Sequence, residues 1–365
     1  MRIAYGVHGY GRGHATRALA ALEALGPRHD IRVFAGGDAH DLLGTRQPVT
    51  RVPCLGLRYR GGKRDSWLTL RSNLPMLLDL VRRGPGVEAV AAEMRAFAPD
   101  VVICDAEPWT NAAAQQLGVP RIGFDHFGVL VHCHVALPFI DWLESFFDRC
   151  AYRWLMRWPE RVLVSSFFPA TPRHSAVKLV GPLLGEHLRH VQPSAGDHLL
   201  VYFNQGTSQL SPRMLDTLGS LGSEVRLYGL GRDAREGAIT YRAPKRDGFL
   251  RDLASCRAVL STAGNQLMGE AMALAKPVLV VPESTVEQRL NAREIVRMGI
   301  GESISPEGLD RRSILGFLER AEGYAERARE LASDGQAQAV EWLERWVQEL
   351  SKSNRPTPLV AAQTV

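Results

Sequence analysis

The stretch from Ser261 to Asn291 holds residues whose types and spacing could bind a charged ligand. Gly264 precedes a segment rich in helix formers, and a helix N-terminus presents free backbone N–H groups and a positive dipole end that suit a diphosphate. Glu270 follows in the first turns, where its carboxylate can accept hydrogen bonds from two vicinal ribose hydroxyls. Gln288 and Asn291 lie one helical turn apart and share a face. Together these residues predict a sugar-nucleotide site.

The segment that must position these residues has the pattern of a strand, a turn, a helix and a second strand. The aliphatic run at 257–260 predicts a short strand, after which Thr262 can cap a helix. Gly264 permits the tight turn into this helix. The helix formers from Asn265 to Ala275 predict the helix itself, which Pro277 ends before the next strand.

In order and spacing, these residues resemble the donor-binding half of GT-B glycosyltransferases. The resemblance is to the broad group that contains the peptidoglycan lipid-intermediate N-acetylglucosaminyltransferase, with its glycosyltransferase family 28 C-terminal domain, and the UDP-glycosyltransferases of small molecules. It implies that Glu270 holds the ribose and that Gln288 with Asn291 holds sugar hydroxyls. It also implies that Phe249 contacts the base, with core packing as the alternative. The implied fold is α/β, with two Rossmann-like domains whose parallel sheets face a central cleft.

A second stretch with chemical potential, Gly9-Tyr10-Gly11-Arg12-Gly13-His14, lies near the N-terminus, before a helix expected from Ala15. Its order differs from the dinucleotide fingerprint G-x-G-x-x-G, and no acidic residue closes the following strand, where 34–37 reads Phe-Ala-Gly-Gly. A nicotinamide cofactor is therefore disfavoured, and we expect no cofactor. The element resembles the first loop of GT-B transferases, in which the glycines open the acceptor side and the histidine acts as a base.

His14 is the candidate base on this interpretation. An acceptor hydroxyl is a weak nucleophile, and a histidine with the ordinary pKa of about 6.5 can remove its proton as the anomeric carbon is attacked. Asp105, expected at the end of a strand, is the candidate partner that orients the ring. Alternatively, His14 caps the helix or binds phosphate, and Asp105 satisfies backbone donors. His8 and the pair Asp125-His126 compete for the role of base, since open α/β sheets place ligands where strands end.

The departing diphosphate is expected to be stabilised without a metal. The dipole of the helix after Gly264 and the amides of Gly206-Thr207-Ser208 can offset its charge. The sequence has no Asp-x-Asp motif, which is evidence against a metal-dependent GT-A enzyme, so no metal ligand is predicted. The candidate donor-binding residues are Gly13, Asn204, Gly206, Thr207, Phe249, Thr262, Gly264, Asn265, Glu270, Gln288 and Asn291.

A chain of 365 residues is longer than one typical core requires, so two domains are expected. Strand and helix patterns alternate along the chain, which predicts parallel, doubly wound sheets. The expected parts are an acceptor-binding Rossmann-like domain at 1–182, a linker at 183–197, a nucleotide-sugar-binding Rossmann-like domain at 198–335, a helix at 336–350 that crosses back to the first domain, and a disordered tail at 351–365.

Composition and charge limit the classes of function. The five cysteines form no C-x-x-C pair, as expected of reduced thiols in a cytoplasmic protein. The chain begins directly with a strand at 2–7, which argues against a secretory signal. The net charge of +5, mostly from arginine, reflects either a general bias of the proteome or an affinity for diphosphates and anionic membranes. No basic stripe or nucleic-acid motif is present, so nucleic acid is not an expected partner.

Two segments, 57–83 and 152–158, mix arginine with tryptophan and leucine. Such patches can dock on the inner face of an anionic membrane and admit a lipid-linked or hydrophobic acceptor. A half-buried helix whose arginines extend to solvent explains them as well. No run of about 20 apolar residues is present, because polar residues interrupt the nearest candidate, 127–147.

The predicted function is inverting, metal-independent transfer of a hexose or N-acetylhexosamine from a UDP-sugar to a hydroxyl acceptor. Two alternatives stay open. Non-hydrolysing UDP-N-acetylglucosamine 2-epimerases share the fold, but they typically have an acidic pair in the helix where Glu270 stands alone. A non-catalytic protein that binds nucleotide sugars would have no activity that depends on His14 or Asp105.

Overall fold

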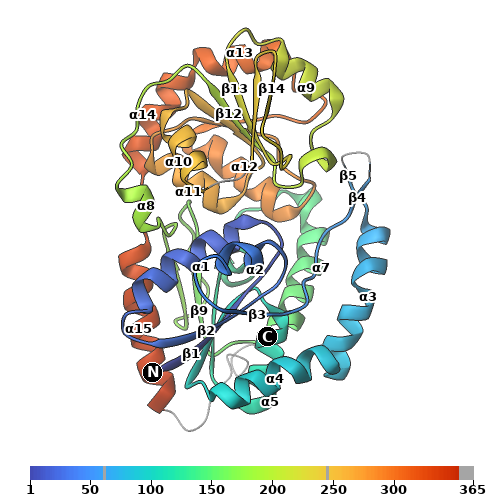
Figure 1. Cartoon of the computed structure of the whole chain (residues 1–365), viewed down its shortest axis with the longest axis vertical. Coiled ribbons are helices and arrows are strands. Elements are labelled where there is room, and N and C mark those ends of the chain that lie inside the picture. The colour runs from blue at the N-terminus through green and yellow to red at the C-terminus, as the bar shows by residue number, and fades with distance from the viewer. Residues whose placement is uncertain (61–62, 244–245, 353–365) are drawn as a thin grey trace. The chain divides into compact units, whose positions relative to one another are not determined.

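The structure is a computed structural model that describes residues 1–60, 63–243 and 246–352 and divides into two compact units (Figure 1). Unit 1 consists of Met1–Leu57, Trp67–Gly185 and the described residues from Gly335 onward. Unit 2 consists of Glu186–Asp334 and the described part of Arg58–Ser66, a hairpin of β4 (Tyr59–Arg60) and β5 (Lys63–Arg64). The sequence pattern gave no sign that this hairpin groups with the second unit.

Unit 1 is built on a seven-stranded sheet in which all neighbours run parallel. Ile3, Tyr5 and Val7 face one hydrophobic core, whereas Ala4 faces the other, as the alternation of side chains along a strand requires. In spatial order the strands are β11 (Val177–Val180), β9 (Arg161–Ser165), β7 (Arg121–Asp125), β6 (Val101–Asp105), β1 (Arg2–Val7), β2 (Asp30–Ala35) and β3 (Val49–Arg51).

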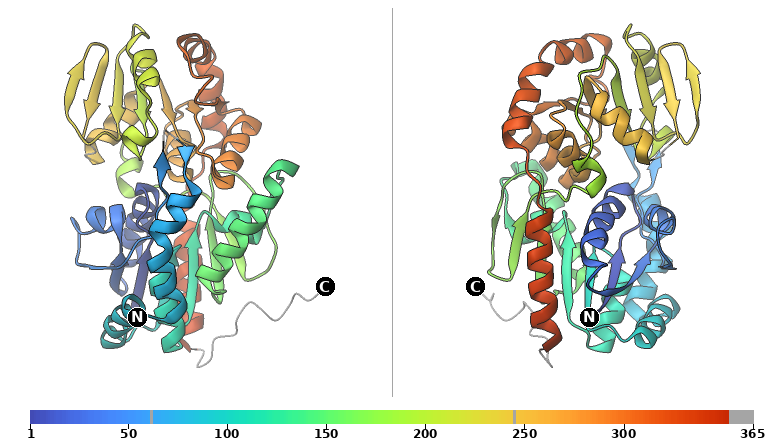
Figure 2. Two further views of the ribbon diagram at one scale, coloured as in Figure 1. Left: turned by 90° about the vertical axis from the view of Figure 1, so that its right-hand side faces the viewer. Right: turned by 60° about the vertical axis from the view of Figure 1, so that its left-hand side comes forward.

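Helices cover both faces of this sheet. α1 (Arg12–Leu25), α2 (Gly37–Leu43) and α15 (Gln336–Lys352) bury apolar residues in the first core, and α4 (Pro85–Phe97) and α5 (Pro108–Leu117) in the second. α15 lies against α1 and the sheet (Figure 2), because Leu343, Trp346 and Leu350 share the first core with β1. The other elements of unit 1 are α3 (Ser66–Arg82), α6 (Gly128–His132), α7 (Phe139–Met156) and an antiparallel pair of short strands, β8 (Cys133–His134) and β10 (Thr171–Pro172).

Unit 2 is built on a second seven-stranded sheet, parallel except for the edge strand β14. In spatial order its strands are β14 (Ala234–Glu236), β15 (Ile239–Arg242), β13 (Val225–Tyr228), β12 (Leu199–Tyr202), β16 (Ala258–Ser261), β17 (Val278–Val280) and β18 (Gly301–Ser303). Its helices are α8 (Glu186–Arg189), the 3₁₀ helix η1 (Gly206–Ser208), α9 (Pro212–Gly219), α10 (Arg246–Ser255), α11 (Asn265–Ala273), α12 (Val286–Met298), α13 (Arg311–Glu319) and α14 (Ala321–Leu331).

The α/β fold class predicted from the alternating pattern is confirmed, with one parallel Rossmann-like sheet in each unit. Within the described residues, no helix is both long enough and apolar enough to cross a membrane. The predicted tail at 351–365 lies almost wholly outside the described residues, which end at Lys352.

Candidate functional site

The ends of two neighbouring strands bring the candidate residues of unit 1 together. β1 and β6 are parallel, and their register pairs Val7 with Asp105. The loop that follows β1 therefore starts beside the end of β6, where the His8 N–H donates to the Asp105 carbonyl at 2.9 Å. Because the sheet sets this register, residues far apart in sequence meet at one edge.

Helix α1 begins earlier than expected, at Arg12 rather than Ala15. Gly11 is its N-cap and has φ 79°, a left-handed value that glycine adopts without strain. Gly13 and His14 consequently lie in the first turn of α1, where a helix fixes the direction of side chains. The sequence pattern had placed both residues in the loop.

Close backbone packing and one carboxylate hold the loop before α1. A Cβ on Gly9 would lie 2.1 Å from the carbonyl oxygen of Gly36, so no larger residue fits there. Asp38 accepts a hydrogen bond from the Gly11 N–H at 3.1 Å, and its own N–H donates to the Gly9 carbonyl at 2.9 Å. These contacts fix the loop before α1 against the start of α2.

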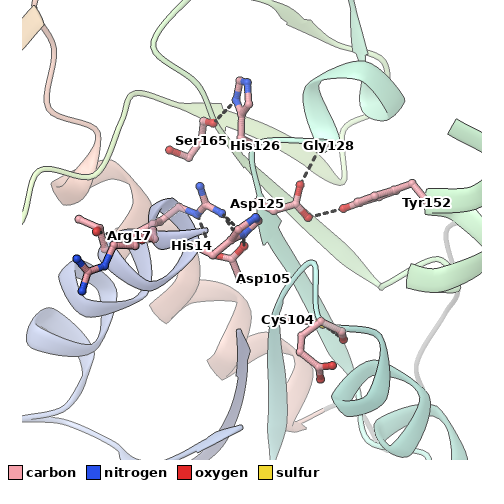
Figure 3. Close-up of polar contacts among 12 residues, drawn as sticks. His14, Arg17, Cys104, Asp105, Asp125, His126, Gly128, Tyr152 and Ser165 are labelled. Carbon is pink, nitrogen blue, oxygen red and sulfur yellow. Dashed lines mark hydrogen bonds and ion pairs between the residues drawn. The ribbon is translucent and has the colours of Figure 1, made fainter. Parts of the chain in front are cut away.

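His14 and Asp105 form a close pair (Figure 3). Nδ1 of His14 lies 2.7 Å from Oδ1 of Asp105. The Asp105 side chain is fully buried, while 25% of the His14 side chain is exposed. A carboxylate only accepts hydrogen bonds, so a neutral ring bound in this way carries its proton on Nδ1 and leaves the Nε2 lone pair open. The arrangement can take a proton from a hydroxyl group at Nε2.

Arg17, which the sequence reasoning did not consider, completes this cluster. Its Nε donates to Asp105 Oδ2 at 2.9 Å, and its Nη2 donates to Oδ1 at 2.5 Å. Burial alone would raise the pKa of Asp105, but the charges of Arg17 and His14 and their hydrogen bonds hold that pKa below its ordinary value. The spacing of Arg17 from His14, three residues on one helix, shows only that the two side chains share a face, which does not by itself indicate a buried ion pair.

The competing histidines have different surroundings. The His8 ring packs edge-on against His14, with centroids 5.2 Å apart, and burial and the neighbouring His14 lower its pKa to about 3. So weak a base holds a proton poorly at neutral pH. His126 is buried, and its Nδ1 lies 2.9 Å from the Ser165 carbonyl oxygen. Of these three histidines, His14 is the one that combines exposure with a carboxylate partner.

Asp125 does not pair with His126 as the sequence suggested. Its Oδ1 accepts from the Gly128 N–H at 2.7 Å, and its Oδ2 accepts from the Tyr152 hydroxyl (Figure 3). Burial and the nearby charge of Asp105 raise the pKa of Asp125, although both hydrogen bonds oppose that shift. Asp125 is therefore part of the buried support behind Asp105.

In unit 2, Gly264 is the N-cap of α11, but the structure corrects the reason for a glycine there. Its φ of −73° and ψ of 125° are open to any residue, so the turn does not require glycine. A Cβ at this position would meet nothing within 4 Å. Neither backbone strain nor packing within the chain explains this glycine, and the space beside it leaves the N-terminus of α11 open.

Gln288 and Asn291, both on α12, clamp the backbone just before Gly264. The Ala263 N–H donates to Gln288 Oε1 at 2.6 Å, and Asn291 Nδ2 donates to the Ala263 carbonyl at 2.8 Å. Asn291 is fully buried. The two side chains thus share a face, as their spacing predicted, and that face fixes the loop that ends at α11.

Buried polar residues line the first turns of α11. Asn265 and Glu270 are both buried, and Glu270 Oε1 accepts from Gln266 Nε2 at 3.0 Å. Thr262, between β16 and α11, is buried as well. This hydrogen bond helps to fix the orientation of the buried carboxylate.

The loop after β12 carries the second group of donor candidates. Gly206 has φ 51°, and a Cβ on it would lie 2.6 Å from the Gly229 carbonyl oxygen, so this position requires glycine. Asn204 precedes it, and Thr207 lies in η1. Two residues that the sequence reasoning missed brace this loop: Gln209 accepts from the Gln205 N–H at 3.0 Å and donates to Glu283 at 2.6 Å.

Two polar atoms at this edge of the sheet are buried without a hydrogen-bond partner among the described residues. They are Oδ1 of Asn204 and Oγ of Ser261. Asn204 follows β12, and Ser261 is the last residue of β16. The two strands are neighbours, since Tyr202 pairs with Ser261 in their register. Buried polar atoms are normally satisfied, so these two mark a place where a ligand group or water would complete the bonding.

Phe249 lies in α10, and its ring packs edge-on against Tyr202 and Tyr228, with centroids 5.5 and 5.1 Å apart. These contacts favour the core-packing alternative for this residue. Gly13 is the one donor candidate in unit 1, and the others all lie in unit 2. Among the described residues, no cluster of three or more His, Cys, Asp or Glu is arranged to hold a metal.

The first half of helix α7 exposes apolar residues and buries polar ones, which the sequence reasoning did not predict. Its buried residues include Asp141 and Ser145, whereas Phe139 is 93% exposed, Ile140 87% and Phe147 61%. Trp142, Leu143 and Phe146 are exposed too. In the segment 152–158, Tyr152 and Met156 are buried, whereas Trp154 is 42% exposed. Most of the exposed apolar residues of α7 therefore precede this segment.

Arginines follow this apolar half of α7. Arg149 has its pKa lowered by burial and by the charges of Arg173 and Arg153, so the three form a basic cluster. Exposed apolar residues also line α3, the other segment singled out by sequence; they are Trp67, Leu70, Leu74, Leu78 and Val81.

Comparisons with known proteins identify the family and the fold. The profile of a family described as Glycosyl transferase family 1 matches residues 1–321. Among solved structures, CalG4, the calicheamicin glycosyltransferase, is 16% identical with a TM-score of 0.67, over 95% of this chain and 98% of that chain. LpCGTa in complex with UDP is 19% identical with a TM-score of 0.64, over 96% and 99% of the two chains.

MurG of Acinetobacter baumannii is similar over 94% of this chain and 99% of that chain, with 15% identity and a TM-score of 0.57. At these identities the likeness establishes a common fold. A search of curated proteins gives no match.

Proposed function

This chain belongs to glycosyl transferase family 1 and is a glycosyltransferase of the GT-B type, and on that premise we propose that it moves a hexose or N-acetylhexosamine from a UDP-sugar to a hydroxyl acceptor. The proposed reaction inverts the anomeric carbon and needs neither a metal nor a cofactor. The observation that carries the proposal is the contact between His14 and Asp105.

The proposed chemical step is a single displacement. Nε2 of His14 accepts the proton of the acceptor hydroxyl while that oxygen forms a bond to the anomeric carbon, and the bond from this carbon to the diphosphate oxygen breaks. The diphosphate leaves with the bonding electron pair. Asp105 stabilises the imidazolium through Nδ1–H. One base and one displacement give inversion, which is why we assign that outcome.

The proposed donor site is the edge of the unit 2 sheet. We assign the diphosphate to the N-terminus of α11, where Gly264 leaves room for it and the free N–H groups offset its charge without a metal. Ser261 and Asn204 supply buried polar atoms nearby in the fold. Glu270 is the proposed ligand of the ribose. The solved complex of LpCGTa with UDP supports a uridine donor by likeness of fold.

We propose different roles for Gln288 and Asn291. Asn291 is fully buried and holds the Ala263 carbonyl, so its proposed role is to position the loop. Gln288 uses Oε1 on the Ala263 N–H, and its Nε2 is the proposed donor to a sugar hydroxyl.

We further propose a hydrophobic or lipid-linked acceptor and contact with an anionic membrane at its cytoplasmic face. The exposed aromatic residues of α7 and the arginines that follow them suit insertion between lipid headgroups and attraction to anionic lipid. Burial of apolar side chains in the bilayer would also explain why this helix turns polar residues inward.

A nucleotide-sugar screen tests the donor assignment. UDP-sugars and UDP should raise the melting temperature of the protein, and a candidate hydroxyl acceptor should then increase the rate of UDP release. Failure of every uridine and thymidine diphosphate to raise the melting temperature would contradict the donor site. Conversion of a UDP-sugar to its epimer without UDP release would instead identify an isomerase.

A further inference from the structure

Arg17 contacts both members of the His14–Asp105 pair. Its side chain is buried, with 2% of the residue exposed. Nε and Nη2 grip both carboxylate oxygens of Asp105, and Nη2 also lies 3.1 Å from Nδ1 of His14. A guanidinium group only donates hydrogen bonds and keeps its charge at any physiological pH, so these contacts restrict what the ring can do.

The two contacts of Nδ1 demand different forms of the ring. A bond from Nη2 of Arg17 needs a bare Nδ1, which puts the proton of a neutral ring on Nε2 and removes its basic lone pair. A bond to Oδ1 of Asp105 needs Nδ1–H and leaves Nε2 bare. The contact with Asp105 is the shorter, at 2.7 Å against 3.1 Å for Arg17, so we take Nδ1–H to donate to Oδ1.

We propose that Arg17 is a positioning residue for His14: its two-pronged grip holds Asp105 so that Oδ1 accepts Nδ1–H, and its charge offsets that of the buried carboxylate. The inference rests on the proposed role of His14 as the base. Without Arg17, Asp105 could rotate away from Nδ1, and the Asp105–His14 pair would take up its first proton at a higher pH.

The other groups around the pair do not supply this charge. From β1, Tyr5 is buried and its pKa lies well above the ordinary value, so the phenol stays neutral. Burial likewise raises the pKa of the Cys104 thiol, while His8 on the preceding loop stays neutral because its pKa is lowered to about 3. From β7, Asp125 adds a second carboxylate. Arg17 is thus the cation that faces both carboxylates.

Two variants separate the charge of Arg17 from its geometry. Arg17→Gln removes the charge, so the acidic limb of the pH–rate profile should move upward by about one pH unit, with about a tenfold loss of rate below it. Arg17→Lys keeps the charge but loses the fork, so the limb should stay and the rate should fall several-fold across the profile. Arg28→Gln is the matched control, since Arg28 pairs with Glu344 at the surface.

Histidine NMR reports the tautomer of His14 directly and needs no assay of sugar transfer. In isotope-labelled wild-type protein at high pH, with His14→Gln used for assignment, His14 should be the Nδ1–H form, and Arg17→Lys should populate the Nε2–H form. An Nε2–H ring in the wild type overturns the proposal even if neither Arg17 variant folds. An unmoved acidic limb in Arg17→Gln also overturns it. Lack of any transfer by the wild type would refute the proposed function while this NMR test still stands.

Discussion

Nδ1 of His14 lies 2.7 Å from Oδ1 of Asp105, although the two residues are 91 positions apart. The register of two parallel strands produces this contact: β6 ends at Asp105 beside Val7, and the chain turns from β1 into α1 within a few residues. The pair therefore rests on the sheet rather than on a free loop. Such support keeps a catalytic geometry fixed before substrate binds.

Asp105→Asn should damage both stability and chemistry. The substitution removes the carboxylate that is directly bonded to the buried Arg17, and breaking a buried ion pair costs about 3–5 kcal/mol of unfolding free energy. It also removes the Asp105 charge that stabilises a protonated His14, so the transfer rate should fall about 100-fold or more. Urea unfolding and steady-state UDP release measure the two effects. Asp100→Asn, near the start of the same strand, is the matched control; an equal effect in both variants would contradict this account.

Gly264→Ala should weaken donor binding without harming the fold. The added Cβ meets no protein atom within 4 Å, but it would stand where we assign the diphosphate. We expect an unchanged melting temperature and at least a ~10-fold rise in the dissociation constant for UDP, by calorimetry, since one lost charge-assisted contact is worth about 1.5–3 kcal/mol. Gly9→Ala is the contrasting variant.

At Gly9 the new Cβ would lie 2.1 Å from the Gly36 oxygen, so that variant should lose about 1–3 kcal/mol of stability. If Gly264→Ala binds UDP as tightly as the wild type, the diphosphate does not lie against α11.

His8 should make the protein less stable as the pH falls. Its pKa is about 3 in the folded protein and about 6.5 in the unfolded chain, so between these values the unfolded state binds the proton first. The contribution of neutral His8 to the free energy of unfolding is therefore fully present above pH 6.5. Below that pH it declines by about 1.4 kcal/mol per pH unit until the folded pKa is reached. His8→Gln should remove this share of the slope in urea unfolding from pH 7 to pH 4. Equal slopes in the two proteins would contradict the assignment.

The exposed face of α7 should bind anionic membranes. Wild-type protein should sediment with vesicles that contain phosphatidylglycerol and less with pure phosphatidylcholine. Ile140→Ser with Phe147→Ser should reduce binding at least ~10-fold, since each buried apolar side chain contributes about 1.5–3 kcal/mol. Val296→Ser, at a residue 53% exposed on α12, is the matched control.

Two results would refute the membrane assignment. One is equal vesicle binding by the α7 double variant and the control. The other is a wild-type dimer that the α7 variant dissociates, because the face would then cover a second copy of the chain. Light scattering after size exclusion distinguishes these cases.

Much of the fold follows from the sequence because buried parallel strands and amphipathic helices leave strong periodic patterns. The pairing of His14 with Asp105 was predictable for the same reason, since parallel strands end at one edge of the sheet. Arg17 was not, because nothing in a helical Arg distinguishes a buried ion pair from a solvated side chain. The sequence placed Gly264 directly before a helix, as the structure confirms, but the reason given for a glycine there was wrong, because a pattern of residues does not reveal whether φ is positive.

Helix α7 shows a different limit. Its spacing of aromatic residues predicts an amphipathic helix, and amphipathicity alone suggests that the apolar face points inward. The structure buries Asp141 and Ser145 instead. Which face of a helix packs against the protein depends on the neighbouring elements. The sequence of the helix alone does not contain that information.

The central claim, that His14 is the base of a sugar transfer, is tested most directly by His14→Ala under two measurements on the same preparation. The account predicts that the rate of acceptor-dependent UDP release falls about 100-fold or more, while the affinity for UDP stays within about a factor of two of the wild type. A variant that binds UDP normally and retains the full transfer rate would remove His14 from the mechanism and contradict the account.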